Sequence, residues 1–345
     1  MRAVIVGGGW MGKLHAECLT EVTGTTVAGL VEPSPCSVAD FTATFDVPVF
    51  DSVTQAAGFG ADLVCVCTPT GLHAPLAIEA LAAGCHVVVE KPLATTVADA
   101  ERMIQAAQAS GRTISVILQY RFNRDALLLK RMVDRGLLGE ILFANVVNYI
   151  HRDGEYFGAN GGWRGTWELN GGGILINQTT HGMDLLDWCM GPITAARGSA
   201  ATRFHPIDVE DTLSAVVDFA VGATGLVQVT SAADRNYPLR LEIVGRDGTA
   251  VFERARLSAV TTAPPVGELL SEAELAALPP APPDAFGEPF GQAHRRQYRA
   301  IVAALRAGGQ PPVPAKDALG SLRTITAIYH AAGILPPAHV AAGDA

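Results

Sequence analysis

The sequence predicts an α/β protein with an N-terminal doubly wound parallel sheet and a C-terminal α/β domain whose sheet is open and mostly antiparallel. Two observations predict this. Apolar strand-like runs alternate with helical patterns over the first third of the chain, and longer β-rich runs joined by glycine-containing turns follow Gly136. The length of 345 residues agrees, because domains of roughly 100 to 200 residues make two the expected number.

Four apolar strands, each followed by a helical pattern, define the first domain. They read as continuous Val, Ile, Leu and Cys rather than as an alternation, which is typical of a parallel sheet covered on both faces. Gly84 and Gly111 stand where two of the helices should end. The expected strands are 2–6, 26–31, 63–67 and 86–89, and the expected helices are 11–21, 36–45, 74–83 and 97–110. We place this domain at 1–120, with a linking helix at 121–136.

The second domain is expected at 137–345. Its β-rich runs lie at 141–150, 212–220, 224–231, 239–244 and 249–252. A glycine-rich loop and one helix at 174–189 interrupt them, and the Pro-rich segment 278–289 is expected to be a linker or a surface excursion. Two closing helices, 292–307 and 317–332, are expected to pack back on the first domain.

Composition excludes several classes of protein. The chain has 49% hydrophobic residues, so it is not disordered. It has 25 Lys and Arg against 34 Asp and Glu, a net charge of −9, and therefore lacks the basic surface that binds nucleic acid. No apolar run reaches 18 residues, no export signal opens the chain, and the six Cys lack zinc-site spacing. We expect a cytoplasmic protein with reduced thiols, no metal, and no nucleic-acid or membrane partner.

A dinucleotide site is predicted at the first strand-to-helix turn. Gly7, Gly9 and Gly12 form the spacing GxGxxG, in which glycines permit a tight turn, close approach of a pyrophosphate and close helix packing. A flexible turn is the alternative, but Glu32 stands twenty residues later at the end of the next strand, where an acid binds the ribose hydroxyls. We therefore expect a Rossmann domain that binds NAD. NADP remains an alternative, because Ser34 can accommodate a phosphate.

Two further motifs place reactive groups. The strand 86–89 is followed by Glu90, Lys91 and Pro92, at the carboxyl edge of the sheet where ligands of such sheets bind. A solvated Lys91 paired with its neighbour is an equally good interpretation. In the expected helix 174–189, the residues Asn177, His181, Asp184 and Trp188 share one face. A histidine bracketed in this way by Asn and Asp favours a site over a buried core histidine.

In this order the motifs resemble the Gfo/Idh/MocA family of NAD(P)-dependent oxidoreductases over nearly the whole chain. The other motifs that carry the resemblance are Thr68-Pro69-Thr70 with His73, Gln119-Tyr120-Arg121-Phe122, Trp163-Arg164-Gly165 and the closing helix from His294. The resemblance implies hydride transfer between nicotinamide and a secondary alcohol or ketone of a sugar, cyclitol, sugar acid or glycoside. It also implies a homodimer or homotetramer assembled through the open sheet.

The resemblance also assigns residues. Lys91 contacts the reacting hydroxyl and His181 is the general acid/base, while Asn177 stands where the family usually has Asp, so either Lys91 or His181 accepts the proton. Residues expected at the cofactor are Gly7, Gly9, Trp10, Met11, Gly12, Glu32, Thr68, Pro69, His73, Glu90, Lys91, Gln119, Trp163 and Arg164. Residues expected at the substrate are Lys91, Tyr120, Arg121, Trp163, Asn177 and His181.

Other functions remain open at this stage. Some relatives are lyases or glycosidases that keep NAD bound and oxidise their substrate transiently, and others are dihydrodiol dehydrogenases. A non-catalytic NAD-binding regulator is disfavoured, because both Lys91 and His181 are retained.

With no carboxylate at Asn177, the second-domain arginines suggest an acidic sugar such as a uronate, although surface solvation is the alternative for any one of them. These arginines are Arg152, Arg164, Arg235 and Arg240.

Overall fold

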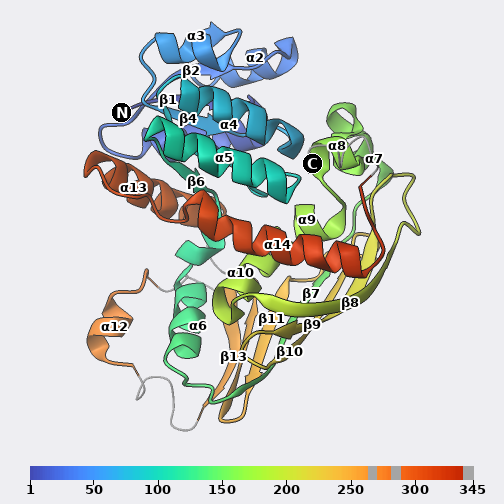
Figure 1. Cartoon of the computed structure of the whole chain (residues 1–345). Helices are drawn as coiled ribbons and strands as arrows, with labels where there is room; N and C mark the ends of the chain where they lie inside the picture. Colours follow the sequence, from blue (N-terminus) through green and yellow to red (C-terminus); the bar gives the residue numbers. More distant parts are fainter. Residues whose placement is uncertain (263–269, 281–288, 337–345) are drawn as a thin grey trace. The chain divides into compact units, whose positions relative to one another are not determined.

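The computed structural model describes residues 1–262, 270–280 and 289–336 (Figure 1). The chain forms two compact units. Unit 1 holds Met1–Leu118 and Phe290–Leu319, and unit 2 holds the described parts of Gln119–Pro289 and Gly320–Ala341. Most of the predicted linker 278–289 lies outside the described residues. None of the described helices is long and apolar enough to span a bilayer.

Unit 1 contains a six-stranded sheet in which every strand pair is parallel. Its order, β3-β2-β1-β4-β5-β6, reverses direction between β1 and β4, as in a doubly wound sheet. The predicted parallel sheet is confirmed, although the four expected strands do not include the short β3 and β6, of two and three residues. The strands are β1 Arg2–Val6, β2 Thr26–Val31, β3 Val49–Phe50, β4 Leu63–Val66, β5 His86–Val89 and β6 Ile114–Val116.

The helices of unit 1 begin and end at residues with clear physical roles. In α5, the Thr96 side chain accepts from the backbone N–H of Asp99, and Gly111 ends the helix at φ 64°. Gly84 likewise follows α4 at φ 87°. The helices are α1 Trp10–Thr20, α2 Pro35–Thr42, α3 Val53–Gly58, η1 Thr70–Leu72, α4 His73–Ala82, α5 Val97–Ser110 and α13 Gln292–Arg306.

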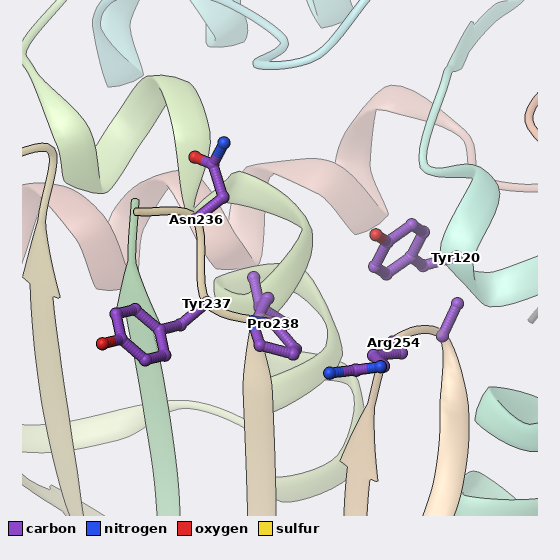
Figure 2. A pocket seen from close by; sticks show the side chains of 7 residues that line it. Tyr120, Asn236, Tyr237, Pro238 and Arg254 are labelled. Carbon is purple, nitrogen blue, oxygen red and sulfur yellow. The ribbon is translucent and has the colours of Figure 1, made fainter. Parts of the chain in front are cut away.

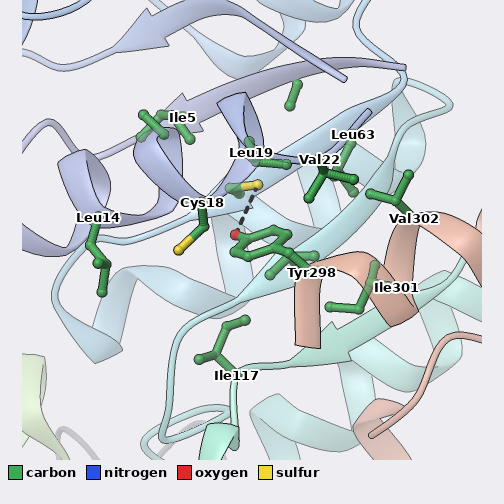
Figure 3. Close-up of a cluster of buried hydrophobic side chains, with 14 of the residues drawn as sticks. Ile5, Leu14, Cys18, Leu19, Val22, Leu63, Ile117, Tyr298, Ile301 and Val302 are labelled. Atoms are coloured by element: carbon green, nitrogen blue, oxygen red, sulfur yellow. Dashed lines mark hydrogen bonds between the residues drawn. The ribbon is translucent and has the colours of Figure 1, made fainter. Parts of the chain in front are cut away.

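Helix α13, from the last sixth of the chain, completes the hydrophobic core of unit 1 (Figure 3). Tyr298, Ile301 and Val302 are buried among side chains of β1, α1 and β4. The Tyr298 hydroxyl, 3.4 Å from the Cys65 sulfur, also contacts the polar network described below. Burying a large apolar side chain contributes roughly 1.5 to 3 kcal/mol, so α13 is an integral part of this unit.

Unit 2 contains a seven-stranded sheet in the order β13-β12-β11-β7-β10-β9-β8. Only β7 and β10 pair in parallel and the other pairs are antiparallel, which confirms the predicted mostly antiparallel sheet. The strands are β7 Ile141–Tyr149, β8 Ile193–Ala201, β9 Thr212–Phe219, β10 Thr224–Thr230, β11 Arg240–Gly245, β12 Gly248–Glu253 and β13 Arg256–Thr262.

Helices α6 and α10 contact this sheet. Burial alternates along β9 and β10, so one face of the sheet is covered. Apolar side chains such as Phe143, 50% exposed, and Val216, 37% exposed, are accessible in the sheet. The helices that belong wholly or mainly to this unit are η2 Gln119–Phe122, α6 Arg124–Asp134, α7 Gly154–Gly158, η3 Ala159–Gly165, α8 Trp167–Asn170, α9 Ile174–Gln178, α10 Thr180–Met190, α12 Glu272–Ala276 and α14 Ala315–Ala331.

Gly12 and Gly9 of the glycine motif allow a matched stability test. A side-chain carbon at Gly12 would overlap the carbonyl oxygen of Gly7, whereas one at Gly9 would meet nothing within 4 Å. We expect Gly12→Ala to lower the free energy of unfolding by about 3 kcal/mol, as overpacking does, and Gly9→Ala to leave it nearly unchanged. Thermal unfolding of both variants checks this, and equal losses would contradict it.

Candidate active site

The glycine turn of unit 1 is built to accept an anion. Gly7 has φ +96°, and a side-chain carbon there would lie 2.9 Å from the Cys67 carbonyl, so only glycine fits. Gly9 is the N-cap of α1 and provides no side-chain cap, and the first turn of α1 holds no acidic residue. The open space in front of Gly9 and the uncapped helix N-terminus fit the pyrophosphate of a dinucleotide.

Glu32 lies directly after β2 and is held by backbone amides. Its Oε2 accepts from the N–H of Gly8 at 2.7 Å, and its Oε1 accepts from the N–H of Ser34 at 2.8 Å. The carboxylate is thereby fixed beside the glycine turn, and each oxygen keeps a second acceptor position for a ribose hydroxyl. Trp10, 67% exposed, begins α1 next to Met11 and lies 4.9 Å from the ring of Phe290.

The loops that follow β4 and β5 are joined by His73. Its Nδ1 lies 2.9 Å from the Pro92 carbonyl oxygen and its Nε2 lies 3.0 Å from that of Thr68. Burial lowers the pKa of His73, which favours the neutral ring. Next to Pro69, the buried hydroxyl of Thr68 has no hydrogen-bond partner among the described residues. Such an orphaned hydroxyl beside Gly7 also fits a site for a polar cofactor.

A buried polar network holds the backbone of Lys91. The Glu90 carboxylate lies 2.8 Å from His15 Nε2 and accepts from the Lys91 backbone N–H at 3.0 Å, and His15 Nδ1 lies 2.7 Å from the Tyr298 hydroxyl. Burial raises the pKa of Glu90, but the interactions with His15, Lys91 and His294 outweigh burial and lower it to about 2. Glu90 is therefore ionised at neutral pH and anchors the backbone of Lys91, whose bond to Pro92 is cis.

The predicted continuous helix 174–189 is wrong, because the chain breaks it into α9 and α10 at Thr179. The Asn148 side chain, from β7, donates to the Gln178 carbonyl at 3.2 Å and to the Thr179 hydroxyl at 3.0 Å. The Thr179 N–H bonds to the carbonyl of Ile174, five residues back, instead of the usual four. Asn177 therefore lies in α9, whereas His181, Asp184 and Trp188 lie in α10, so the predicted shared face holds for these three residues and not for Asn177.

His181 is held by two of the residues that the sequence singled out. Its Nε2 lies 3.1 Å from Nε2 of Gln119, and the Tyr120 ring stacks on the imidazole at 4.8 Å with 18° between the planes. The buried Gln119 carbonyl oxygen has no hydrogen-bond partner in the described structure. By rotating its amide, Gln119 can donate to a neutral imidazole or accept from an imidazolium.

Other predicted site residues contact neighbouring side chains within unit 2. The buried Arg121 donates from Nε and Nη2 to the two oxygens of Asp184, at 2.9 and 2.6 Å. Its guanidinium also lies 5.3 Å from the Trp188 ring. Asn177 donates to the Asn170 side chain. Trp163 and Arg164 lie together in η3, with the guanidinium 4.8 Å from the indole ring.

A pocket of about 380 Å³ opens in unit 2 next to Tyr120 (Figure 2). Arg254 enters from the turn between β12 and β13, where both Arg254 and Ala255 have positive φ, at 52° and 57°. The volume is within the range of small-molecule sites. The lining residues are Tyr120, Asn236, Tyr237, Pro238, Leu239, Arg254 and Ala255. Apart from Tyr120, the sequence provides no motif that singles them out.

The sequence also failed to identify Glu210, which fixes the glycine-rich loop. Its carboxylate accepts from the backbone N–H groups of Gly173 and Leu175, at 2.7 and 3.0 Å, and from the Tyr329 hydroxyl at 2.8 Å. Burial raises its pKa to about 7, although these three donors oppose the rise. A lone acid before a strand has no sequence signature, because its three partners come from distant segments.

The raised pKa of Glu210 predicts a pH-dependent stability. Between pH 4.5 and about 7 the folded chain binds a proton that the unfolded chain releases, so stability falls as the pH rises through this window. The fall reaches up to about 3 kcal/mol, because one pKa unit corresponds to about 1.4 kcal/mol. Denaturant unfolding across this pH range measures it.

Two variants isolate the contribution of Glu210 to this slope. Glu210→Gln removes it, and Tyr329→Phe extends the fall above pH 7, because it deletes a donor that lowers the Glu210 pKa. If the Gln variant keeps the slope of the wild type, another group causes it.

Comparison with known proteins agrees with this architecture. Residues 1–118 match the model of the oxidoreductase family with an NAD-binding Rossmann fold, and residues 126–251 match the GFO/IDH/MocA C-terminal domain. The chain is similar to the WlbA dehydrogenase from Bordetella pertussis in complex with NADH and UDP-GlcNAcA, with 30% identity, a TM-score of 0.86 and 98% of each chain covered.

Two curated relatives have different activities. Levoglucosan dehydrogenase of Pseudarthrobacter phenanthrenivorans is 27% identical over 286 residues, 73% of each chain. Alpha-N-acetylgalactosaminidase of Shewanella oneidensis is 29% identical over 214 residues, 54% of this chain and 46% of that protein. The two matched domains span most of the chain, and the chain therefore belongs to the Gfo/Idh/MocA family of oxidoreductases, with its NAD-binding Rossmann domain and C-terminal domain.

Proposed function

We propose that this chain is an NAD-dependent dehydrogenase or reductase that transfers a hydride between nicotinamide and a secondary alcohol or ketone of a sugar, cyclitol or sugar acid. The observation that carries the proposal is His181, held between the Gln119 amide and the Tyr120 ring beside a pocket of small-molecule size. Similarity to levoglucosan dehydrogenase and to the WlbA dehydrogenase in complex with UDP-GlcNAcA supports a carbohydrate substrate.

In the proposed mechanism, NAD supplies the hydride acceptor when it is bound. The substrate hydroxyl loses its proton to His181 or to Lys91 as the carbinol hydrogen leaves as hydride. Gln119 supports His181 in either protonation state, and the Tyr120 face stabilises an imidazolium. Lys91 is positioned through its backbone by ionised Glu90. Asn177 is an amide, so it orients neighbouring groups without adding a negative charge.

The test is the absorbance of reduced nicotinamide with NAD or NADP and a panel of cyclitols, aldoses, uronates, glycosides and dihydrodiols. We expect one class to reduce the cofactor. Lys91→Ala or His181→Ala is expected to lower kcat roughly 10²- to 10⁴-fold, the contribution of a general acid or base. The exposed Lys316→Ala serves as the control, with unchanged rates.

The pH profile then identifies the proton acceptor. The wild-type kcat/KM for oxidation should rise with pH as that group deprotonates, and the rise should vanish only in the variant that lacks it. No reduction by any class, with NAD still bound, would contradict the dehydrogenase.

A glycosidase that oxidises its substrate transiently is the second candidate, favoured by the similarity to alpha-N-acetylgalactosaminidase. It would cleave a glycoside without a net change in NAD absorbance. Product analysis by chromatography in the same assays therefore separates the two functions.

Glu32 is expected to select NAD over NADP. Its carboxylate, fixed by Gly8 and Ser34, would repel a 2′-phosphate. We expect Glu32→Gln, which keeps the size and removes the charge, to shift the ratio of kcat/KM for NAD and NADP at least about tenfold toward NADP, since 1.4 kcal/mol is a factor of ten. An unchanged ratio would show that another group sets the preference.

A further inference from the structure

Two of the four candidate arginines of unit 2 have no carboxylate partner among the described residues. Of the four that the sequence suggested for an acidic substrate, Arg235 lies 3.5 Å from Asp234, and Arg240 lies 2.8 Å from Glu242. Arg152 and Arg164 have no carboxylate within 4.0 Å among residues 1–262, 270–280 and 289–336. Both are half-buried in a chain of net charge −9. Neither guanidinium is therefore neutralised by an acid of the described chain.

The two guanidinium groups share one aromatic side chain. Each lies 4.9 Å from the centre of the Tyr156 ring, and Arg164 also lies 4.8 Å from Trp163. The turn before Arg164 has Asn160 in the left-handed region at φ 53° and two glycines after it at 78° and 75°. Stacking on the aromatic rings uses the faces of the guanidinium groups and leaves the N–H donors at their edges.

Several of these donors have no acceptor. Arg152 donates from Nη1 to the His151 carbonyl and the Asn236 side chain, at 2.8 and 3.1 Å, and from Nη2 to Gln178 at 3.1 Å. Its Nε–H is buried without a hydrogen-bond partner in the described structure. The Arg164 side chain donates no hydrogen bond to any described residue. A guanidinium has five N–H donors, so many of the N–H groups of Arg152 and Arg164 donate no hydrogen bond to the described chain.

The arginine pair adjoins the candidate active site within unit 2. Gln178, which donates to the Tyr156 hydroxyl at 2.5 Å, directly follows Asn177. Asn236 accepts from Arg152 and also lines the pocket, whose Tyr120 stacks on His181 (Figure 2). Two residues that line the pocket thus contact these groups: Tyr120 contacts His181, and Asn236 contacts Arg152.

We propose that Arg152 and Arg164, stacked on Tyr156, bind an oxyanion carried by the substrate, so that the chain acts on a sugar acid or sugar phosphate in preference to the neutral sugar. This inference rests on the proposed oxidoreductase function for the same site. Planar guanidinium donors match the paired oxygens of a carboxylate or phosphate, and the anion would supply the counter-charge that the chain lacks.

The experiment is a binding measurement by calorimetry with NADH present. Uronates, sugar 6-phosphates and the parent neutral sugars are compared, both free and as nucleotide-diphosphate derivatives. At least one anionic sugar should bind with a Kd at least tenfold lower than that of its neutral parent sugar. Arg164→Gln and Arg152→Gln should each weaken that anion about 10- to 100-fold, as loss of a charged hydrogen bond does, and leave the neutral sugar unchanged. A preference for carboxylate over phosphate, or the reverse, identifies the oxyanion.

Arg235→Gln and Arg240→Gln are the matched controls, because both side chains are already neutralised by carboxylates. They should change neither affinity. The Arg164 variant has no side-chain hydrogen bond to lose, so its fold should persist, and thermal unfolding verifies this. Arg164→Lys should restore only part of the affinity, because an ammonium keeps the charge but loses the planar donor edge.

Three outcomes would overturn the proposal. They are equal binding of every anion and its parent sugar, equal weakening of both in the Arg164 variant, and loss of the preference in Arg254→Gln alone, which would place the anion at the pocket turn. Failure of the proposed oxidoreductase function would give a different result. Anion binding that depends on Arg164 without any cofactor chemistry would leave the oxyanion site standing and remove the oxidoreductase function.

Discussion

A buried backbone N–H must find an acceptor, and in this chain carboxylates provide that acceptor in several loops of the candidate site and its surroundings. Glu32 accepts from Gly8, Glu90 from Lys91, and Glu210 from Gly173 and Leu175. Asp211 accepts from three successive amides of the 203–205 turn. Glycine-rich loops have few side chains to hold them, so these carboxylates determine the course of the backbone where chemistry is proposed.

The same constraint explains why charge differs so much among neighbouring groups. The hydrogen bond to His15 and the nearby Lys91 keep Glu90 ionised, whereas Glu210 has only neutral donors and is close to half-protonated near neutral pH. Arg121 and Asp184 pair with each other, while Arg152 and Arg164 stack on aromatic rings without an acid. The arrangement separates charges used for structure from charges available to a ligand.

Local patterns predicted both sheets and most helices, because strand runs, glycine turns and helix periodicity are visible within a few residues. They could not predict β8, whose Ala, Gly and Ser residues give no alternation, or the break at Thr179, which depends on Asn148 some thirty residues away. Of the predicted site residues, Gln119, Tyr120 and His181 meet in unit 2. The pocket turn at Arg254 and the partners of Glu210 arise from long-range packing, which one sequence does not reveal.

The place of α13 in the core of unit 1 has a consequence for how the chain is made. Residues 1–118 leave the ribosome long before Tyr298, Ile301 and Val302 are synthesised, and the apolar surface that these side chains cover is exposed until then. Completion of this unit requires contacts across more than 170 residues of sequence, such as that of Gln297 with Val116, and such distant contacts slow folding. Until then the nascent N-terminal segment exposes apolar surface, the condition in which a chain is prone to aggregate and chaperones act.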